Sequence, residues 1–469
     1  MLKQLLCHEN NSLLEALRLI NTTGLGAVFI TDDDDKMTGL LTDGDIRREI
    51  LKGVHLDEKA GKFANRTFTF GRADEEVASL LKKVSDKIKI IPILDETGRV
   101  VDHFLYDRKI HLPVAEPTLQ GNEFNYLVDA FLSTWISSAG HYLDRFQKEF
   151  PAYVDCEYGV ATSNGTVAIH LALAALGIGP GDEVIVPDLT FGATINAVLM
   201  AGAAPVIVDI EEDSWCIDPV RIREAVTTKT KAIIPVHLYG QACDMDAIMA
   251  IAKEKKLFVI EDCAEAHGAM FKGKKVGSFG DIGTYSFFGN KIITTGEGGM
   301  CVTHSETLYE KMKVLRDHGM NKEKRYWHDE VGFNYRMTNL QASLGTAQLE
   351  RIDTILQNKV EIEESYRSYL GDLDVVHFQK DIPNRHRVIW LVCAWFANGK
   401  RDAYLDAFKA VGVDVRPFFY PLSDMPVFKP YTHSNRVSRE IAYKGINLPS
   451  VKPLTEKTAD IIRKVIQNT

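Results

Sequence analysis

The first hundred residues show the same order of hydrophobic and polar positions twice. In each copy, a stretch with apolar residues at helical spacing precedes two short apolar runs of strand length, which a turn separates. The pattern predicts, in the first copy, a capped helix from residue 12, strands over 27–31 and 38–41 and a helix start over 42–51, and in the second copy a helix from residue 74 and strands over 88–94 and 100–105. Two copies of one supersecondary unit should combine into a small α+β module over residues 1–110.

A change of pattern follows this module. Residues 111–121 contain two prolines and no helical period, so we expect a linker there. From residue 122 onward, helical patterns alternate with apolar runs, which predicts an α/β domain with a mostly parallel central sheet. A long helical pattern over 341–369 then leads to shorter strands and a last helix, the pattern of an α+β lobe. We therefore expect a large domain over 122–355 and a small domain over 356–469.

Composition and charge narrow the class of protein. With 45% hydrophobic and 25% charged residues, the chain of 469 residues is typical of a soluble globular protein, and its net charge of −9 argues against a nucleic-acid binder. No apolar run approaches the length that crosses a bilayer, and the first residues lack the features of a signal peptide. Seven scattered cysteines without CxxC spacing predict reduced thiols in a cytoplasmic protein, not disulfides or a metal site.

Lys291 lies in the stretch Thr284–Gly299, which begins as an apolar strand and then becomes rich in glycine. Between Phe288 and Ile292, we expect this lysine to have few charges nearby and a partly dry environment, which favours the nucleophilic form of an amine. Nucleophilic lysines form imines with carbonyl compounds, which is the chemistry of pyridoxal phosphate (PLP) enzymes. The alternative is a surface lysine that follows a buried strand.

Other residues supply what this cofactor needs. Asp262 ends a predicted parallel strand, where a carboxylate can face the ligand crevice and keep the pyridine nitrogen of PLP protonated; a helix cap is the alternative. The helix that begins near Gly165 and Thr166 offers free backbone N–H groups to a phosphate, although similar turns also cap helices that bind nothing. Phe191, just past another strand end, could stack on the cofactor ring or belong to the core.

The motifs SNGT, EDCAEAHGA, SFFGNKIITTGEGG and GFNYRMTNLQASLGTAQLER together resemble those of the DegT/DnrJ/EryC1/StrS family of PLP-dependent sugar aminotransferases, over about residues 115–469. The resemblance implies the fold-type I aminotransferase architecture and an obligate homodimer with shared active sites. It also implies that Lys291 is the Schiff-base lysine and distinguishes the chain from relatives that carry histidine there and act as dehydratases. The other implied roles are the pyridinium contact for Asp262, ring stacking for Phe191, a place near the 3-hydroxyl for Glu265, phosphate binding for Gly165, Thr166 and Ser286, and a phosphate contact from the neighbouring subunit for Asn334.

Segments 325–339, 415–426 and 446–450 are similar to the GDP-perosamine synthases of this family. The similarity implies amination of GDP-4-keto-6-deoxy-D-mannose with L-glutamate as donor, in the synthesis of O-antigen or related polysaccharide sugars. Ser423 stands where this subgroup is expected to have histidine, so a UDP- or dTDP-linked keto sugar is an alternative substrate. A PLP-dependent sugar dehydratase or isomerase and a ligand-sensing regulator are the alternative functions. Candidates for substrate contacts are Trp135, His318, Arg416 and Tyr420, although the last two could equally be ordinary surface residues.

The run GLLTDGDIRREIL in the first copy of the N-terminal repeat resembles the signature of CBS domains, so the module over 1–110 is similar to a CBS pair. The resemblance implies that Thr42 and Asp45 hold the ribose of an adenine nucleotide. The second copy reads VDHFLYDRK after Val100 and lacks the Thr-x-x-Asp pattern, so we expect its site to be lost. A module that only packs, or that contributes to a higher oligomer, is the alternative to a ligand sensor.

Overall fold

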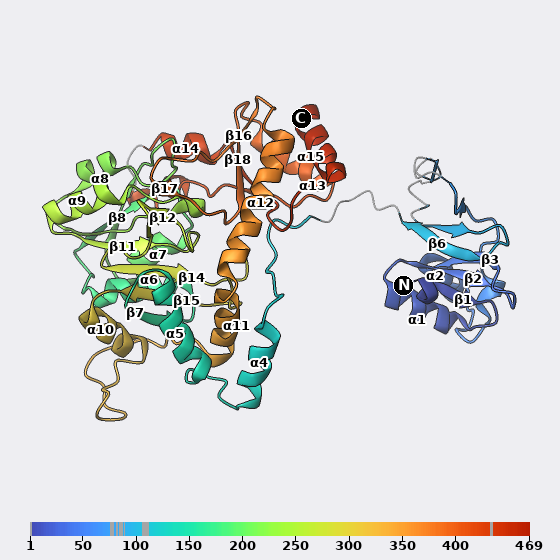
Figure 1. Ribbon diagram of the computed structural model, residues 1–469, viewed down its shortest axis with the longest axis horizontal. Helices are drawn as coiled ribbons and strands as arrows, with labels where there is room; N and C mark the ends of the chain where they lie inside the picture. The colour runs from blue at the N-terminus through green and yellow to red at the C-terminus, as the bar shows by residue number, and fades with distance from the viewer. Residues whose placement is uncertain are drawn as a thin grey trace. The chain divides into compact units, whose positions relative to one another are not determined.

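The computed structural model describes residues 2–75, 79–80, 83, 88, 90–105, 112–431 and 435–469. The chain divides into two compact units, Met1–Lys109 and Ile110–Thr469, and each is considered by itself (Figure 1). Within the described residues, no helix combines the length and the apolar character needed to cross a membrane.

The first unit is built from two halves with the same strand topology. The elements are β1 (Leu6–His8), α1 (Leu13–Thr23), β2 (Ala27–Thr31), β3 (Met37–Thr42) and α2 (Asp43–Leu51) in the first half, and β4 (Gly71–Arg72), β5 (Ile90–Leu94) and β6 (Val100–Leu105) in the second. In each half the middle strand pairs in parallel with the first strand and antiparallel with the third. Buried side chains of both halves, such as Phe29 and Ile90, pack in one core. The predicted repeat is therefore confirmed, although most of the helix expected after Asp74 falls outside the described residues.

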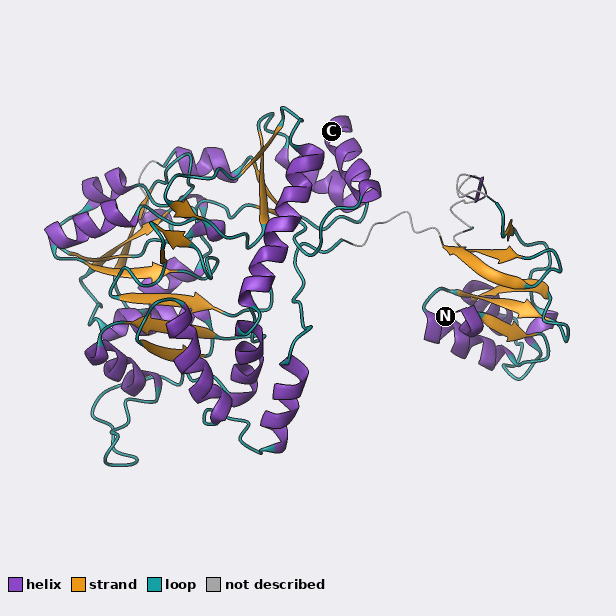
Figure 2. Cartoon of the chain, viewed as in Figure 1, coloured by secondary structure: helices purple, strands orange, loops and turns teal. Residues whose placement is uncertain are grey.

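A seven-stranded sheet forms the centre of the second unit (Figure 2). In spatial order, its strands are β7 (Tyr158–Thr162), β15 (Gly299–Thr303), β14 (Ile282–Ser286), β11 (Phe258–Asp262), β10 (Thr230–Ile233), β8 (Glu183–Pro187) and β9 (Ala204–Val208). All neighbours run parallel except β15, which is antiparallel to β14 and to β7. The carboxyl ends of six strands therefore meet at one edge of the sheet, where such folds bind ligands.

Helices cover both faces of this sheet, since separate hydrophobic cores lie on its two sides. One core includes side chains of α6 (Gly165–Ala175), α7 (Ala193–Met200) and α10 (Glu306–Arg316), and the other includes side chains of α4 (Glu123–Leu132), α5 (His141–Tyr153), α8 (Pro219–Ala225), α9 (Met245–Lys255) and α11 (Asn339–Leu349). Strands β14 and β15 are buried along their whole length. The predicted α/β class with a mostly parallel sheet is confirmed.

The C-terminal lobe contains a separate antiparallel sheet and core. Its elements are α12 (Ile352–Leu370), β16 (Val376–Phe378), β17 (Arg385–His386), β18 (Val392–Phe396), α13 (Arg401–Ala410), β19 (Arg416–Pro417), α14 (Val437–Ala442), β20 (Gly445–Leu448) and α15 (Glu456–Asn468), of which β17 pairs with β12 (Met270–Phe271) of the large domain. The single long helix expected over 341–369 was wrong, because the chain breaks at Glu350 and Arg351 between α11 and α12. Ile352 and Ile355 of α12 belong to the core of the large domain, whereas Ile362 belongs to that of the lobe, so the expected boundary after residue 355 falls inside one helix.

The segment expected to be a linker is docked on the lobe. Leu112 is only 2% exposed, lies in the core of the lobe and forms a bridge with Val413. The carbonyl oxygen of Val114 accepts a 2.9 Å hydrogen bond from the backbone N–H of Ser450. Prolines exclude a helix here but do not prevent an extended chain from packing, which explains the difference from the expectation.

We predict that Leu112→Ala destabilises the second unit by about 2–5 kcal/mol, because it removes a fully packed side chain from a core. Leu119→Ala is the matched control in the same segment: Leu119 is 57% exposed, so the free energy of unfolding should change by less than about 0.5 kcal/mol. Urea unfolding of the full chain measures both. If Leu112→Ala changed the free energy of unfolding as little as Leu119→Ala does, the segment would be a passive linker.

Candidate active site

A cavity of about 620 Å³ opens at the carboxyl edge of the parallel sheet. The ends of β11 and β14, the start of α6 and the loops after β8 and β14 contribute to it, and two aromatic residues come from the C-terminal lobe. The lining residues used below are Ser163, Asn164, Gly165, Thr166, Thr190, Phe191, Thr194, Asp262, Glu265, Ser286, Asn290, Lys291, Trp390 and Phe419. The cavity thus joins segments that lie more than two hundred residues apart in the sequence.

Lys291 reaches this cavity from the loop that follows β14. Its side chain is 11% exposed, and Nζ lies 3.6 Å from Oε1 of Glu265 and 3.9 Å from the ring centroid of Trp390. The dry environment expected for this lysine is present. The expectation of few charges nearby was wrong, because a buried carboxylate that is 26 residues away in the sequence is brought beside the amine.

Asp262 ends β11 and is almost fully buried. Its Oδ2 accepts a 2.8 Å hydrogen bond from the Thr194 hydroxyl, and its Oδ1 accepts a 3.1 Å hydrogen bond from the backbone N–H of Ala264. Burial raises the pKa of the Asp262 carboxyl, while the Thr194 and Ala264 donors and the Lys291 ammonium act in the opposite direction. The carboxylate is therefore held rigidly at the cavity wall, where it can meet a cationic ligand group.

Glu265 follows β11 by one turn and is also buried. Its Oε2 accepts a 2.9 Å hydrogen bond from the backbone N–H of Tyr239. Burial raises the pKa of Glu265 to about 7, and this shift persists although the nearby Lys291 ammonium and the Tyr239 N–H lower the pKa. Near neutral pH this carboxyl group can therefore exchange a proton.

The raised pKa of Glu265 predicts a specific pH dependence of stability. The unfolded chain ionises this group near pH 4.5 and the folded chain near pH 7, so its contribution is intact below pH 4.5 and is lost as the pH rises through 7. This shift corresponds to a loss on the order of 3 kcal/mol. Glu265→Gln should remove this loss. Urea unfolding of both proteins at pH 5 and pH 8 measures the effect, and parallel pH profiles would contradict it.

The start of α6 forms a cradle for an anion. Asn164 caps the helix by accepting a 3.0 Å hydrogen bond from the Val167 N–H, which leaves the N–H groups of Gly165 and Thr166 at the cavity. Ser286, at the end of β14, lies so close that a Cβ atom on Gly165 would be 2.7 Å from the Ser286 Cβ. Glycine is thus required at 165 for the helix start and the serine hydroxyl to border the same space.

Two aromatic side chains form another wall. Phe191 is 60% exposed although it borders the cavity, and its ring lies 5.7 Å from that of Phe419, at 49°. An apolar ring that is left open at a cavity is available to pack on a flat ligand. Sequence reasoning missed Thr194, Trp390 and Phe419. Thr194 could have been found, because it follows Thr190 by one helical turn just after a strand end. No local pattern marks Trp390 or Phe419.

Five other predicted site residues do not line the cavity. Trp135, Arg416 and Tyr420 are exposed, the last with Arg401 over its ring. The ring of His318 lies 3.2 Å from Asp317, and the Asn334 side-chain oxygen accepts a 3.1 Å hydrogen bond from Arg336. Their roles toward substrate or a neighbouring subunit therefore stay predictions.

In the N-terminal unit, Thr42 and Asp45 form the capping box of α2. The Thr42 hydroxyl accepts a 3.1 Å hydrogen bond from the Asp45 backbone N–H, and the Asp45 carboxylate accepts hydrogen bonds from the Thr42 backbone N–H and from Arg48. The structure thus gives both residues a local structural role. Their predicted contact with a nucleotide is not tested by it.

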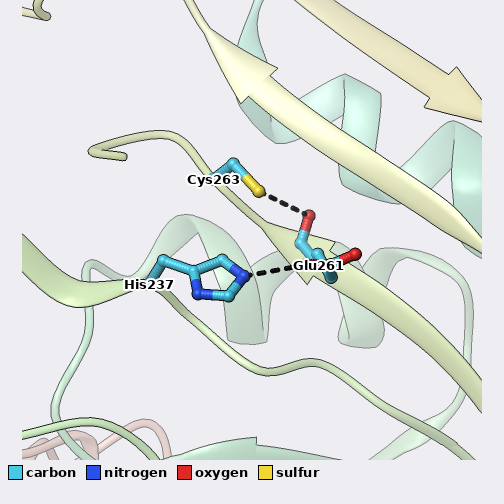
Figure 3. Close-up of side chains that lie close together, drawn as sticks. All are labelled: His237, Glu261 and Cys263. Carbon is cyan, nitrogen blue, oxygen red and sulfur yellow. Dashed lines mark hydrogen bonds and ion pairs between the residues drawn. The ribbon is translucent and has the colours of Figure 1, made fainter. Parts of the chain in front are cut away.

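Figure 3 shows a second polar group, which does not line the cavity and is formed by His237, Glu261 and Cys263; its potential metal-ligand atoms lie within 4.8 Å of one another. Both Glu261 oxygens are already used: Oε1 accepts from the N–H groups of Phe279 and Gly280, and Oε2 accepts from Gly277 N–H and from His237 Nε2 at 3.1 Å. Burial raises the pKa of Glu261, but His237 and these N–H groups lower it further than burial raises it. The group therefore joins loops to the sheet and leaves no free carboxylate oxygen for an ion.

The residues around the cavity fit pyridoxal phosphate. The lysine amine of Lys291 can meet its aldehyde, the Asp262 carboxylate its pyridine nitrogen, and the α6 N–H groups with Ser286 its phosphate. Phe191 can pack on the ring. Each chemical group of the cofactor thus finds a suitable partner within one cavity of ordinary ligand size.

GDP-perosamine synthases are among the known proteins of similar sequence. The chain is 44% identical to the GDP-perosamine synthase of Escherichia coli O157:H7 over 348 residues, which cover 74% of this chain and 95% of that protein. It is 46% identical to the GDP-perosamine synthase of Caulobacter vibrioides over 363 residues, which cover 76% of this chain and 96% of that protein.

Solved structures agree with this relationship. The aminotransferase from Psychrobacter cryohalolentis superimposes with a TM-score of 0.70 at 32% identity, covering 75% of this chain and 97% of that one. A putative sugar aminotransferase from Streptococcus pneumoniae in its PLP form does so with a TM-score of 0.71 at 26% identity, covering 76% and 98%. Residues 1–52 match the CBS domain, and residues 117–467 match the DegT/DnrJ/EryC1/StrS aminotransferase family. With Lys291 and Asp262 facing one cavity, the chain thus belongs to the DegT/DnrJ/EryC1/StrS family and is a PLP-dependent aminotransferase with an N-terminal CBS domain.

Proposed function

We propose that the chain transfers an amino group from L-glutamate to a nucleotide-linked 4-keto-6-deoxy sugar, with GDP-4-keto-6-deoxy-D-mannose as substrate and GDP-perosamine as product. The observation that supports it most is the identity of 43–46% to three GDP-perosamine synthases over 95–98% of their length. The geometry of Lys291, Asp262 and the α6 cradle supports the same reaction type.

In this proposal the chain's own residues have separate roles. The bound PLP supplies an aldehyde that accepts the amino group and a ring that stabilises negative charge on carbon. Lys291 would move a proton from the α-carbon of glutamate to the C4′ carbon of the cofactor, and then, with the keto sugar bound, from C4′ to the sugar carbon that receives the amino group. Asp262, fixed by Thr194, keeps the pyridine nitrogen protonated. The α6 N–H groups and Ser286 hold the phosphate.

A panel of nucleotide keto sugars tests the substrate. Purified protein is incubated with L-glutamate and with GDP-, UDP- or dTDP-linked 4-keto-6-deoxy sugars, and 2-oxoglutarate and the amino sugar are quantified. We expect one 2-oxoglutarate per amino sugar and the highest kcat/KM with the GDP sugar. A higher kcat/KM with the UDP- or dTDP-linked sugar would show that the substrate carries a different nucleotide, while the reaction type would stay the same. Sugar conversion without 2-oxoglutarate would indicate a dehydratase or isomerase.

We further propose a homodimer in which Asn334 completes the partner's site. The helix α4 and the loop after it expose Phe124, Phe131, Leu132 and Trp135, an apolar surface of the kind that subunit interfaces cover. Asn334 lies outside the cavity of its own chain. Mixing inactive Lys291→Ala and Asn334→Ala variants tests this arrangement, because a dimer with shared sites regains activity in one of its two sites. No recovery after subunit exchange would contradict it.

For the N-terminal unit we propose an adenine-nucleotide sensor that uses Thr42 and Asp45, which Asp45→Ala should abolish. Calorimetric titration of the full chain with ATP, ADP and AMP, together with rate measurements, tests it. No heat and no change in rate would leave the unit a packing or oligomerisation module. A cytoplasmic location is part of the proposal, because all seven cysteines are unpaired and buried, which fits a reducing compartment.

A further inference from the structure

The Lys291 amine has two partners in the cavity wall, and one of them belongs to the C-terminal lobe. Trp390 lies between β17 and β18, is 4% exposed, and places its ring centroid 3.9 Å from Lys291 Nζ. The other partner is Glu265, whose Oε1 is 3.6 Å from the same nitrogen. A cation over an indole face is attracted by the negative face of the ring, and the attraction grows where water is excluded. Both partners therefore attract a positive charge at this nitrogen.

Trp390 also contacts the main chain that carries Lys291. Its indole N–H donates a 2.6 Å hydrogen bond to the carbonyl oxygen of Asn290, the preceding residue. One side chain from the lobe thus determines both where this loop lies and what its lysine touches. A residue that only filled space would need neither contact.

The local backbone around Tyr239 holds the two partners in place. Tyr239 is fully buried with φ of 51°, a left-handed conformation that is uncommon for a residue with a side chain. Its N–H donates to Glu265 Oε2 at 2.9 Å, and its ring lies on that of Trp390, with centroids 6.1 Å apart and planes at 18°. The uncommon backbone therefore fixes the carboxylate and the indole at the same time.

Gly240 allows the lobe to approach this closely. At φ of 89°, a Cβ atom on this residue would lie 2.0 Å from the Val388 carbonyl oxygen. Val388, two residues before Trp390, donates a 3.0 Å hydrogen bond from its N–H to the Gly240 carbonyl oxygen. Glycine is thus required for the segment with Trp390 to reach the cavity.

We infer that Trp390 is a positioning residue that, together with Glu265, holds the Lys291 side chain in place and stabilises the positive charge that this side chain carries after it has taken a proton from the donor. This inference rests on the role proposed above for Lys291. Two opposite effects follow. Trp390 and Glu265 together stabilise the lysine once it has accepted a proton from the donor. They also lower the reactivity of the free amine as a nucleophile.

Trp390→Leu tests both effects in the full chain. In the loaded enzyme, the single-turnover half-reaction with glutamate should slow about 10-fold, with a smaller change in glutamate affinity. In the cofactor-free chain at saturating PLP, the first-order rate of covalent attachment, followed by absorbance, should rise about 3-fold. Trp390→Phe keeps a ring face, so it should restore most of the half-reaction rate.

Trp395→Leu is the matched control. Trp395 lies in β18 and also has a lysine over its ring, since Lys444 Nζ is 5.0 Å from the ring centroid, but Trp395 is not among the cavity-lining residues. Both rates should stay within about 2-fold of wild type in this variant. A fall of both rates in Trp390→Leu, or no change in either, would overturn the inference and leave Trp390 a packing residue. Covalent attachment of PLP in a Lys291→Ala chain would instead overturn the proposed role of Lys291.

Discussion

Replacing Lys291 with alanine should abolish covalent attachment of PLP and reduce transamination by about 10⁴-fold or more, because the variant loses both the nucleophile and the group that moves the proton. The absorbance of the protein with PLP and the release of 2-oxoglutarate from glutamate measure the two losses. The surrounding contacts make the position specific: among the described residues that line the cavity, Lys291 is the one with an amine.

A second lysine provides the control for this experiment. Burial lowers the pKa of Lys359 to about 8, so by reactivity alone it is a competing candidate. Its Nζ donates a 2.6 Å hydrogen bond to the Ser450 carbonyl oxygen, and it is not among the cavity-lining residues. Lys359→Ala should therefore keep covalent attachment and turnover. If it lost attachment while Lys291→Ala kept it, the active-site assignment would be wrong.

Asp262→Asn should lower kcat by roughly 10²- to 10⁴-fold while PLP still attaches to Lys291. The amide has nearly the same shape and can still accept a hydrogen bond from Thr194, but it carries no charge to keep a pyridine nitrogen protonated. The absorbance of the bound cofactor, compared between the two proteins, reports the change at the ring. The loss of rate is measured as the release of 2-oxoglutarate in single-turnover reactions with glutamate.

Thr194→Val serves as the graded comparison for this variant. It removes the 2.8 Å hydrogen bond to Asp262 but leaves the charge, so we expect a loss of rate smaller than that of Asp262→Asn. Asp262→Asn with a rate within about 3-fold of wild type would show that the carboxylate does not act on the cofactor. A loss of covalent attachment in that variant would instead indicate a structural role at the end of β11.

The C-terminal lobe contributes to the wall of the cavity, although its own sheet is separate from the central sheet. Trp390 and Phe419 both come from the C-terminal lobe and border the same cavity as Lys291. The Tyr239 hydroxyl accepts a 3.0 Å hydrogen bond from the Phe419 backbone N–H, while the Tyr239 backbone N–H donates to Glu265. Substitutions at the junction of the two parts are therefore expected to change rates without touching a substrate.

The sequence alone determined the features that depend on short stretches of chain. Lys291 after β14, Asp262 at the end of β11 and the glycine at the start of α6 are each marked by their neighbours, because the end of a parallel strand and the start of a helix place a residue at the ligand edge wherever the sheet forms. The repeat in the N-terminal unit was visible for the same local reason.

Only the tertiary structure decided which distant side chains complete the site and which predicted boundaries hold. Trp390 meets the loop of Lys291 across about a hundred residues, and Leu112 packs beside Val413 although its segment reads as a linker. Neither contact leaves a periodic signal, since each depends on how the lobe docks on the sheet domain. The burial that raises the pKa of Glu265 and the ammonium beside it exist only once these surfaces have closed around the cavity.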